Sequence, residues 1–379
     1  MTKKNEEERF KKETMKQEFD LKQIEKPLLA WFAGHARVLP WREEPTPYRV
    51  WVSEIMLQQT RVEAVKPYFE RFTKELPDVA ALAACSEERL LKLWEGLGYY
   101  NRVRNMQTAA RTVMEEYDGR LPADYEKLLT LKGIGSYTAG AVASIAYGIP
   151  VPAVDGNVLR VIMRVTADDS DIMKQSVKSR VEKELLAVIP KDAAGAFNQA
   201  LMELGATVCL PNGEPHCAQC PWESFCEARK QGIWQTLPVK SRAKPRRIEE
   251  KTVLIIRDGE RIVLHKRGAK GLLAGLYEFP NLAGHLSEEE VLSYVREQDL
   301  VPVHIEKLED AKHIFSHIEW HMTGYMVRVS ELETEQSGLL FVEVEDSEKR
   351  YPIPAAFAAY TKYMNLRLGN ERFSADTDQ

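Results

Sequence analysis

The sequence predicts a multi-domain protein in which an all-α domain precedes an α+β domain. The first observation is a helical spacing of apolar residues from about residue 21 to residue 206. One such stripe consists of Val62, Val65, Phe69, Phe72 and Leu76. The second observation is that apolar residues alternate, as they do in strands, beyond about residue 250. With 379 residues and 44% hydrophobic content, the chain is long enough for two separate cores.

The segment between these two patterns, residues 237–250, is typical of an interdomain linker. It carries five basic residues around Pro245 and almost nothing to bury. We therefore expect five segments along the chain. They are a charged tail at 1–20, a helical domain at 21–236 with a cysteine loop at 209–226, a basic linker at 237–250, an α+β domain at 251–368 and a tail at 369–379.

Charge and hydropathy limit the classes of function. The net charge of −5 gives no overall attraction to phosphate, so a nucleic-acid surface would have to be a local patch. No stretch approaches the ~18 apolar residues of a membrane span, and the first twenty residues are charged rather than signal-like. We expect a cytoplasmic protein without a membrane segment.

A glycine-containing turn at 131–137 is the first candidate site. Gly133 and Gly135 allow a sharp turn next to Lys132, and they leave backbone N–H groups bare where the next helix begins. The positive end of that helix suits a phosphate. An ordinary connection between two helices explains the same residues, so the turn alone indicates no function.

Asp155 is the second candidate. It follows an apolar run stiffened by prolines and opens an apolar helix, which is the pattern of a helix N-cap. Capping and catalysis are compatible, because a carboxylate at a helix N-terminus stays ionised and can face a developing cation.

Glu54 is the third candidate. At helical spacing it shares a stripe with Val50, Trp51 and Leu57, so its carboxyl is expected on a mostly apolar face. Burial raises the pKa of a carboxyl, and a protonated carboxylic acid can act as a general acid. The alternative is a solvated helix glutamate without a role.

Four of the five cysteines cluster with the spacing Cys-x7-Cys-x2-Cys-x5-Cys. Four thiolates hold either a zinc ion or a [4Fe–4S] cluster, and the presence of a single CxxC pair favours the cluster. His216 next to Cys217 keeps a Cys/His zinc site open. Disulfides are the least favoured interpretation in a reducing cytosol.

Strand and helix signals continue in the second half of the chain. Residues 253–264 predict a strand, a tight Asp-Gly turn and a strand. Ser287 and Glu290 form a capping-box pattern for a helix. Alternation returns at 318–322 and at 339–344, and a last helix is expected at 355–366.

Seven motifs in this order resemble the helix-hairpin-helix glycosylase superfamily and, within it, the MutY family of adenine DNA glycosylases. They are PWR at 40–42, WVSEIMLQQT at 51–60, EGLGYYNRVRN at 95–105, LKGIGSYTAGA at 131–141, PAVDGNVLRV at 152–161, FNQALMELGATVC at 197–209 and FSH at 315–317. The resemblance covers about residues 20–366. It implies a monomeric enzyme of base excision repair that acts on double-stranded DNA and hydrolyses the N-glycosidic bond of adenine opposite 8-oxoguanine or guanine.

The resemblance also assigns roles to individual residues. Glu54 would protonate adenine at N7, Asp155 would stabilise or capture the sugar cation, and Tyr137 and Asn157 would orient Asp155. The adenine pocket would consist of Trp41, Arg42, Leu57 and Gln199. The residues that enter or hold the DNA would be Gln59, Tyr99, Lys132, Gly133 and Gly135. The residues that read 8-oxoguanine would be Phe315, Ser316 and His317. Core packing explains the apolar members of these sets equally well.

The resemblance further assigns a [4Fe–4S] cluster to Cys209, Cys217, Cys220 and Cys226. Family members usually have six residues between the first two cysteines, whereas this chain has seven. The second domain resembles a Nudix fold, with GLYEFPN at 275–281, but it lacks the acidic REx2EExG metal-binding helix. We therefore expect no nucleotide hydrolysis there.

Two alternatives differ from this interpretation. An endonuclease III-like glycosylase/lyase for oxidised pyrimidines would carry a Schiff-base lysine where this chain has Tyr137. A DNA-binding scaffold without catalytic activity would not need Glu54 and Asp155.

Overall fold

The computed structural model describes residues 19–241, 245–259, 261–332, 338–369 and 371. Contacts divide the chain into two compact units. The first unit consists of Met1–Trp51 and Pro122–Ser241, and the second of Val52–Leu121 and Arg242–Gln379. Most of the two predicted tails, and residues 242–244 of the predicted linker, lie outside the described residues.

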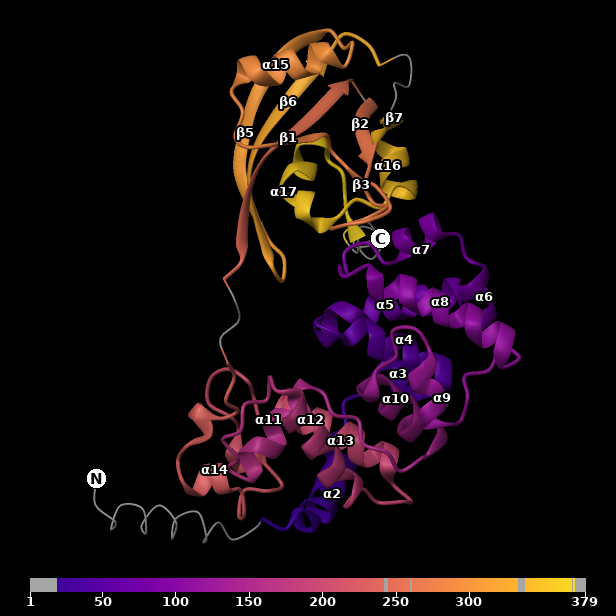
Figure 1. The fold of residues 1–379 in the computed structure, drawn as a ribbon, viewed down its shortest axis with the longest axis vertical. Helices are drawn as coiled ribbons and strands as arrows, with labels where there is room; N and C mark the ends of the chain where they lie inside the picture. The colour runs from indigo at the N-terminus through magenta and orange to yellow at the C-terminus, as the bar shows by residue number, and fades with distance from the viewer. Residues whose placement is uncertain (1–18, 242–244, 260, 333–337, 370, 372–379) are drawn as a thin grey trace, which may run out of the picture. The chain divides into compact units, whose positions relative to one another are not determined.

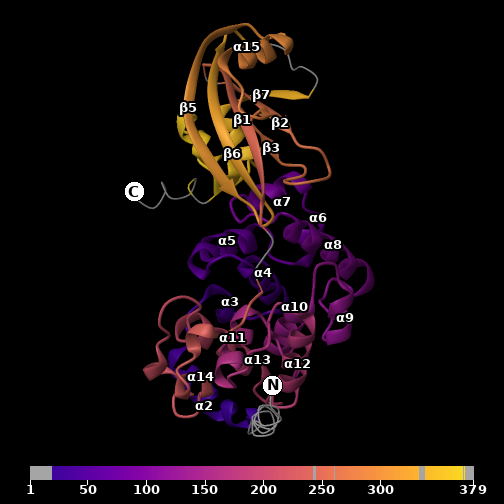
Figure 2. The ribbon, with the colours of Figure 1, turned by 60° about the vertical axis from the view of Figure 1, so that its left-hand side comes forward.

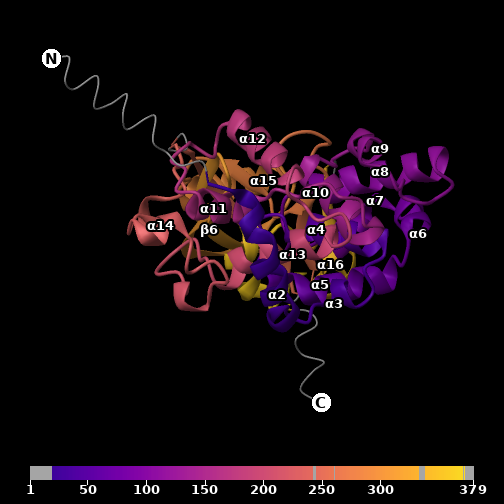
Figure 3. The same ribbon diagram turned by 90° about the horizontal axis from the view of Figure 1, so that it is seen from below.

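The first unit is helical, as the sequence predicts. Its elements are η1 (Leu21–Ile24), α2 (Glu25–His35), α3 (Pro40–Glu43), the start of α4 (Pro47–Leu57), α9 (Tyr125–Thr130), α10 (Ser136–Ala141), a π-helical turn η2 (Val142–Ala146), α11 (Gly156–Val165), α12 (Gln175–Leu186), α13 (Ala194–Thr207), η3 (Cys217–Gln219), α14 (Glu227–Lys230) and η4 (Trp234–Thr236). Helix α13 packs against both α11 and α2 (Figure 3). Helix α11 is the most enclosed, because every residue from Val158 to Val165 is buried.

The second unit contains the remaining helices of the helical domain. They are the end of α4, α5 (Val62–Glu75), α6 (Val79–Ala84), α7 (Glu87–Leu93) and α8 (Asn101–Glu116). On α5 the predicted apolar stripe is buried at Val65, Phe69 and Phe72. Among the helices that the structure describes, none is both long and apolar enough to cross a bilayer.

The second unit also contains a mixed sheet (Figure 1). Its strands are β1 (Arg247–Asp258), β2 (Arg261–Lys266), β3 (Tyr277–Glu278), β4 (Asn281–Ala283), β5 (Pro302–Ile314), β6 (Ile318–Val329) and β7 (Leu339–Glu343). The order is β3-β2-β1-β6-β5, with β4 paired to β1 and β7 paired to β2. Strands β1 and β6 are parallel, and the long strands β1, β6 and β5 run alongside one another (Figure 2).

Each face of this sheet packs a different layer of helices, because alternate side chains point to opposite faces. Val253 and Ile255 share a cluster with the C-terminal helices, whereas Leu254 and Ile256 share one with α15 (Glu288–Glu297). The C-terminal helices are α16 (Val344–Arg350), η5 (Ala355–Phe357), α17 (Ala358–Thr361) and η6 (Lys362–Met364). The predicted strand pair at 253–264 and the Ser287–Glu290 capping box are confirmed.

Two boundaries differ from the sequence prediction. Strand β1 begins at Arg247, inside the predicted linker, because residues from Arg247 onward pair with β6 from Ile318 onward. The helix expected at 355–366 is divided into η5, α17 and η6. It ends at Met364, because Asn365 adopts the left-handed conformation with φ of 53°.

Candidate functional site

The turn between α9 and α10 exposes the polar and glycine residues that the sequence singled out. Lys132, Gly133 and Gly135 are exposed, whereas Leu131 and Ile134 are buried and anchor the turn. Gly133 has a φ of 79°, which a residue with a side chain rarely adopts. Gly135 is the N-cap of α10 and provides no side chain to cap it. The turn is therefore exposed, and its binding of a DNA phosphate stays a prediction.

Asp155 caps α11, as the sequence predicts. Its Oδ1 accepts a hydrogen bond of 2.8 Å from the backbone N–H of Val158, and its Oδ2 accepts one of 2.9 Å from Nδ2 of Asn157. Burial raises the pKa of Asp155, while these two donors and the nearby Arg160 act to lower it. Asn157 thus contacts the carboxyl of Asp155, and the catalytic roles of both residues stay predictions.

Asn157 is held in turn by Arg160 from the next turn of α11. Nη2 of Arg160 donates to Oδ1 of Asn157 at 2.9 Å and to the carbonyl of Gly205 at 2.7 Å. Its Nε donates to the carbonyl of Cys209 at 2.9 Å. A continuous series of hydrogen bonds thus joins Asp155 to the first cysteine of the cysteine loop.

The four clustered cysteines line one cavity in the first unit. The other residues that line it are Arg164, Val208, Pro215, Glu223, Ala228, Arg229 and Trp234. Nη1 of Arg164 lies 3.3 Å from Sγ of Cys209. Burial raises the pKa of Cys220 to about 12, so binding of a metal group would release protons.

Four cysteines on one cavity can hold either a single zinc ion or an iron–sulfur cluster. Among the described residues, no group of three His, Cys, Asp or Glu side chains is arranged to hold a single metal ion. The [4Fe–4S] cluster that the family resemblance implies stays a prediction.

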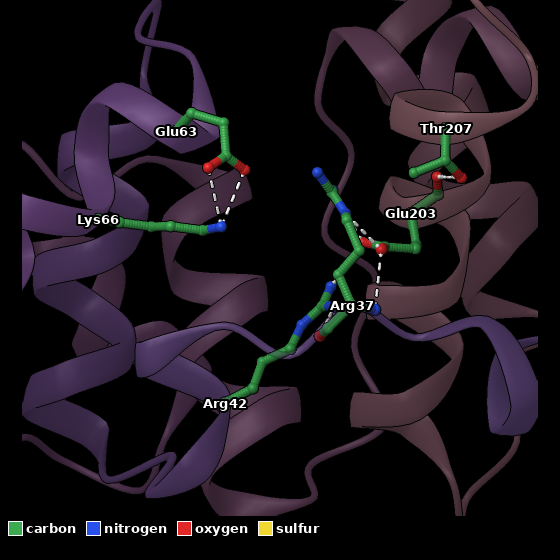
Figure 4. A network of polar contacts seen from close by, with 6 residues as sticks. All are labelled: Arg37, Arg42, Glu63, Lys66, Glu203 and Thr207. Atoms are coloured by element: carbon green, nitrogen blue, oxygen red, sulfur yellow. Dashed lines mark hydrogen bonds and ion pairs between the residues drawn. The ribbon is translucent and has the colours of Figure 1, made fainter.

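Three residues of the predicted adenine pocket lie in the first unit. Trp41 is buried, at 6% exposed, while Arg42 and Gln199 are partly exposed. Nη2 of Arg42 donates to Oε2 of Glu203 at 2.9 Å, and Nε of Arg37 donates to Oε1 at 2.6 Å (Figure 4). The guanidinium of Arg42 is therefore oriented by a buried carboxylate.

Helix α13 orients further parts of the first unit. Met202 accepts from the hydroxyl of Tyr137 at 3.7 Å, which directs that ring toward α13. The fully buried Asn198 accepts from the backbone N–H of Ala153 at 3.0 Å and donates to the hydroxyl of Ser144 at 2.8 Å. Asn198 thus fixes the segment that leads to Asp155.

Glu54 and Leu57 lie in the part of α4 that belongs to the second unit. Asp155 and the other pocket residues belong to the first unit. Glu54 is buried, at 5% exposed, as its apolar stripe predicts. Two residues beyond α4, Gln59 is exposed and has a φ of 61°. Tyr99 is 49% exposed and also has a positive φ, of 46°.

The predicted lesion-reading residues form the tip of the β5–β6 hairpin. Phe315 packs edge-on against His313 and Trp320, with ring centroids 4.6 and 4.8 Å apart. Ser316 and His317 are exposed, and Oγ of Ser316 lies 3.5 Å from the hydroxyl of Tyr99. The structure thus brings Tyr99 and the FSH segment together within the second unit.

Several residues that orient these groups are absent from the sequence prediction. They are Arg37, Arg102, Arg160, Asn198 and Glu203. Arg160 lies on the helix that Asp155 opens, and its position one turn after Asn157 is a signal that could have found it. The partners of Asn198 and Glu203 are distant in sequence, so no local pattern identifies them.

A helical hairpin with an exposed glycine turn, in one unit with a helix-capping aspartate, is the arrangement of helix-hairpin-helix DNA glycosylases. Residues 52–191 match the family model of the HhH-GPD superfamily of base excision DNA repair proteins, and residues 252–363 match the NUDIX domain. An adenine DNA glycosylase of Homo sapiens is 36% identical over 352 residues, which cover 77% of this chain and 64% of that protein. An adenine DNA glycosylase of Buchnera aphidicola (subsp. Acyrthosiphon pisum) is 31% identical over 303 residues, which cover 80% of this chain and 85% of that protein.

The chain therefore belongs to the adenine DNA glycosylases, which are hydrolases of base excision repair. The family resemblance and the two-part fold predicted from the sequence are confirmed. A solved structure of a trapped endonuclease III–DNA covalent intermediate matches with a TM-score of 0.47 and 28% identity, covering 56% of this chain and 97% of that one.

Proposed function

We propose that this chain releases adenine from double-stranded DNA where the adenine lies opposite 8-oxoguanine or guanine, and that it does not cleave the DNA backbone. The observation that carries the proposal is the pair of carboxyl groups at the expected positions. Glu54 is buried on α4, and Asp155 is held by two N–H donors at the start of α11. A general acid must carry a proton and an anionic stabiliser must not, and N–H donors favour the ionised form of Asp155 against the effect of burial.

The two carboxyls would act on one extruded nucleotide. Glu54 donates a proton to N7 of adenine, so the base can leave with the electron pair of the broken N-glycosidic bond. Asp155 stabilises the positive charge that develops on the sugar or captures it covalently, and water then adds to the anomeric carbon. Asn157 and Tyr137 keep Asp155 in the required orientation. Trp41, Arg42, Leu57 and Gln199 would enclose the base.

Adenine must leave the base stack before this chemistry, at a cost of a few kcal/mol. Gln59 and Tyr99 would enter the stack, and the turn with Lys132, Gly133 and Gly135 would hold a phosphate. Contacts with adenine alone do not distinguish a lesion from an A·T pair, so the partner base must also be read. Phe315, Ser316 and His317 would read 8-oxoguanine, which fits the approach of Ser316 to Tyr99.

A [4Fe–4S] cluster held by Cys209, Cys217, Cys220 and Cys226 belongs to this proposal. When bound, the cluster would fix the fold of the 209–226 loop. Arg160 and Arg164 contact the backbone or the sulfur of Cys209, so a fixed loop would also support α11. The proposal includes a monomer that works in the cytosol, where thiolate ligands stay reduced.

Base release from synthetic duplexes tests the proposal. We expect the parent chain to release adenine opposite 8-oxoguanine, and to release neither adenine opposite thymine nor cytosine opposite 8-oxoguanine. Glu54→Gln removes the proton donor and Asp155→Asn removes the negative charge, so each variant should lose at least ~100-fold in the single-turnover rate.

Two controls separate the alternatives. Borohydride should trap no covalent complex with abasic DNA, whereas trapping would support an endonuclease III-like lyase. Adenine release at the same rate by the parent and by both variants would contradict the assigned roles. Binding without any release by the parent would identify a scaffold and would refute the proposed function.

A further inference from the structure

Arg102, the second residue of α8, binds the backbone of two separate segments of the second unit. Its Nη1 donates to the carbonyls of Ile55 at 2.7 Å, Met56 at 3.2 Å and Gln58 at 2.5 Å. Its Nη2 donates to the carbonyls of Leu97 at 3.0 Å and Gly98 at 3.2 Å. One guanidinium thus joins the end of α4 to the loop before α8.

Each of these two segments leads directly to an exposed residue with a strained backbone. Gln59 follows Gln58 with a φ of 61°, and Tyr99 follows Gly98 with a φ of 46°. Non-glycine residues adopt such angles only where the surroundings impose them. The guanidinium carbon also lies 5.5 Å from the centre of the Tyr99 ring. Arg102 therefore contacts the backbone directly before Gln59, the backbone directly before Tyr99 and the ring of Tyr99.

We propose that Arg102 is a positioning residue that holds Gln59 and Tyr99 together in the conformation that enters the DNA stack. The inference rests on the proposed function, because it assigns the step of base extrusion to a preformed pair of residues. Arg102 itself touches backbone carbonyls and aromatic rings of this chain, and it is not assigned a contact with the substrate.

The chemistry of the site requires arginine in particular. The planar guanidinium presents donors in two directions, so Nη1 and Nη2 serve one segment each. A lysine ammonium is a single point charge and cannot span both sets of carbonyls in this geometry. Burial lowers the pKa of Arg102 to about 10, so the group is still cationic at neutral pH. The carbonyls at the end of α4 suit this charge, because the C-terminal end of a helix is its negative pole.

Arg102→Lys tests the inference, and Arg111→Lys on the same helix is the matched control. Arg111 is exposed, and its Nε donates to the carbonyl of Ala83, away from both segments. Two substrates are compared in single-turnover adenine release. In the first, the target adenine is paired with 8-oxoguanine in an intact duplex. In the second, the same adenine again lies opposite 8-oxoguanine but within a short bubble of mismatched neighbours, where it leaves the stack more easily.

We expect Arg102→Lys to lower the rate on the intact duplex by at least about tenfold and to leave the rate on the bubble close to that of the parent. The fluorescence rise of 2-aminopurine at the target position, which reports unstacking, should fall with the rate on the intact duplex. Arg111→Lys should match the parent on both substrates. Thermal unfolding of each full-length variant shows whether the protein is folded at the assay temperature.

Two results would overturn the inference. One is an unchanged rate of Arg102→Lys on the intact duplex. The other is an equal loss on both substrates, which would mean that Arg102 only maintains the fold. Failure of the proposed function is distinguishable from either, because in that case the parent chain itself releases no adenine from either substrate.

Discussion

Glu203 carries a negative charge into the interior of the first unit, where two arginines pair with it. The side chain is 1% exposed and forms ion pairs with Arg37 and Arg42. Burial acts to raise the pKa of Glu203, but the hydrogen bonds and charges of the two arginines outweigh it and lower the pKa. The ionised form therefore stabilises the folded chain.

We expect Glu203→Gln to lower the free energy of unfolding by about 2 to 3 kcal/mol at pH 7, because two arginines lose a buried partner. A carboxyl whose pKa is lower in the folded chain than in the unfolded chain stabilises the fold at pH values above its unfolded pKa, which is ~4.3 for glutamate. This stabilisation is lost as the pH falls through the folded pKa. The difference between parent and variant should therefore shrink below about pH 4. Urea unfolding at pH 7 and in acid measures both effects.

Glu63→Gln is the control for this experiment. Glu63 pairs with Lys66 on α5, within the second unit, and its side chain is 76% exposed (Figure 4). An exposed pair contributes less than about 0.5 kcal/mol, so this variant should match the parent at both pH values. An equal loss in the two variants would contradict a special role for Glu203.

For single residues, the sequence predicted those whose role follows from neighbours along the chain. It did not predict those whose contacts are distant in sequence. Asp155 was predictable as a helix cap because the backbone N–H that donates to its carboxylate lies only three residues away, at Val158. The burial of Glu54 was predictable from the apolar residues at helical spacing around it. Arg102 was not predictable, because its partners near the end of α4 are backbone carbonyls 44 to 47 residues away.

Among the elements, α10 lies unusually close to the segment that leads to Asp155. A Cβ atom on Gly140 would lie 2.2 Å from the carbonyl oxygen of Pro152. Alanine normally stabilises a helix interior by ~1 kcal/mol relative to glycine. Here we expect Gly140→Ala to destabilise the chain by about 1 to 3 kcal/mol, because either α10 or the backbone near Pro152 must move.

Gly140→Ala should also reduce adenine release, since the displaced segment carries Asp155. Gly34→Ala in α2 is the matched control, because a Cβ atom there would meet no other atom within 4 Å. The control should be as stable as the parent or more stable. Thermal unfolding and single-turnover rates of both variants measure the effects, and a stabilised, fully active Gly140→Ala would contradict this prediction.

Regular elements with a clear period were predictable, and irregular ones were not. The two apolar runs on either side of the Asp258-Gly259 turn predicted two strands of the sheet, and Ser287 with Glu290 predicted the start of α15. The π-helical turn η2 has no pattern of its own in the sequence. It lies where Ser144 receives a hydrogen bond from Asn198, which is 54 residues away. The local sequence therefore predicts an ordinary α-helix at these residues.

At the scale of the whole chain, the division into compact units does not follow the order of the sequence. Residues 52–121 of the helical domain form one unit with the sheet. A buried ion pair joins these parts, because Lys92 and Glu95 lie 2.9 Å apart and are 8% and 1% exposed. Glu95 accepts from the backbone N–H groups of Ile353 at 2.8 Å and Gly369 at 3.1 Å. Nζ of Lys92 donates to the carbonyl of Tyr351 at 2.9 Å.

This pair holds the C-terminal segment of the second unit against α7 and the residues that follow it. We expect Glu95→Gln to destabilise the chain by about 3 kcal/mol, because it leaves the ammonium of Lys92 buried without its carboxylate. Adding Lys92→Met should restore part of the loss, since the double variant no longer contains an uncompensated buried charge. A double-mutant cycle in urea unfolding measures the coupling between the two residues.

Hydrogen exchange on the full-length chain locates the effect. In Glu95→Gln, amide protection should fall first in residues 347–369, whose backbone the pair holds, and should persist in α15, which packs on the opposite face of the sheet. A uniform fall across both segments would mean that the pair contributes only to global stability. A local loss would show that the buried pair stabilises the C-terminal segment, whose backbone it binds at Tyr351, Ile353 and Gly369, more than the rest of the second unit.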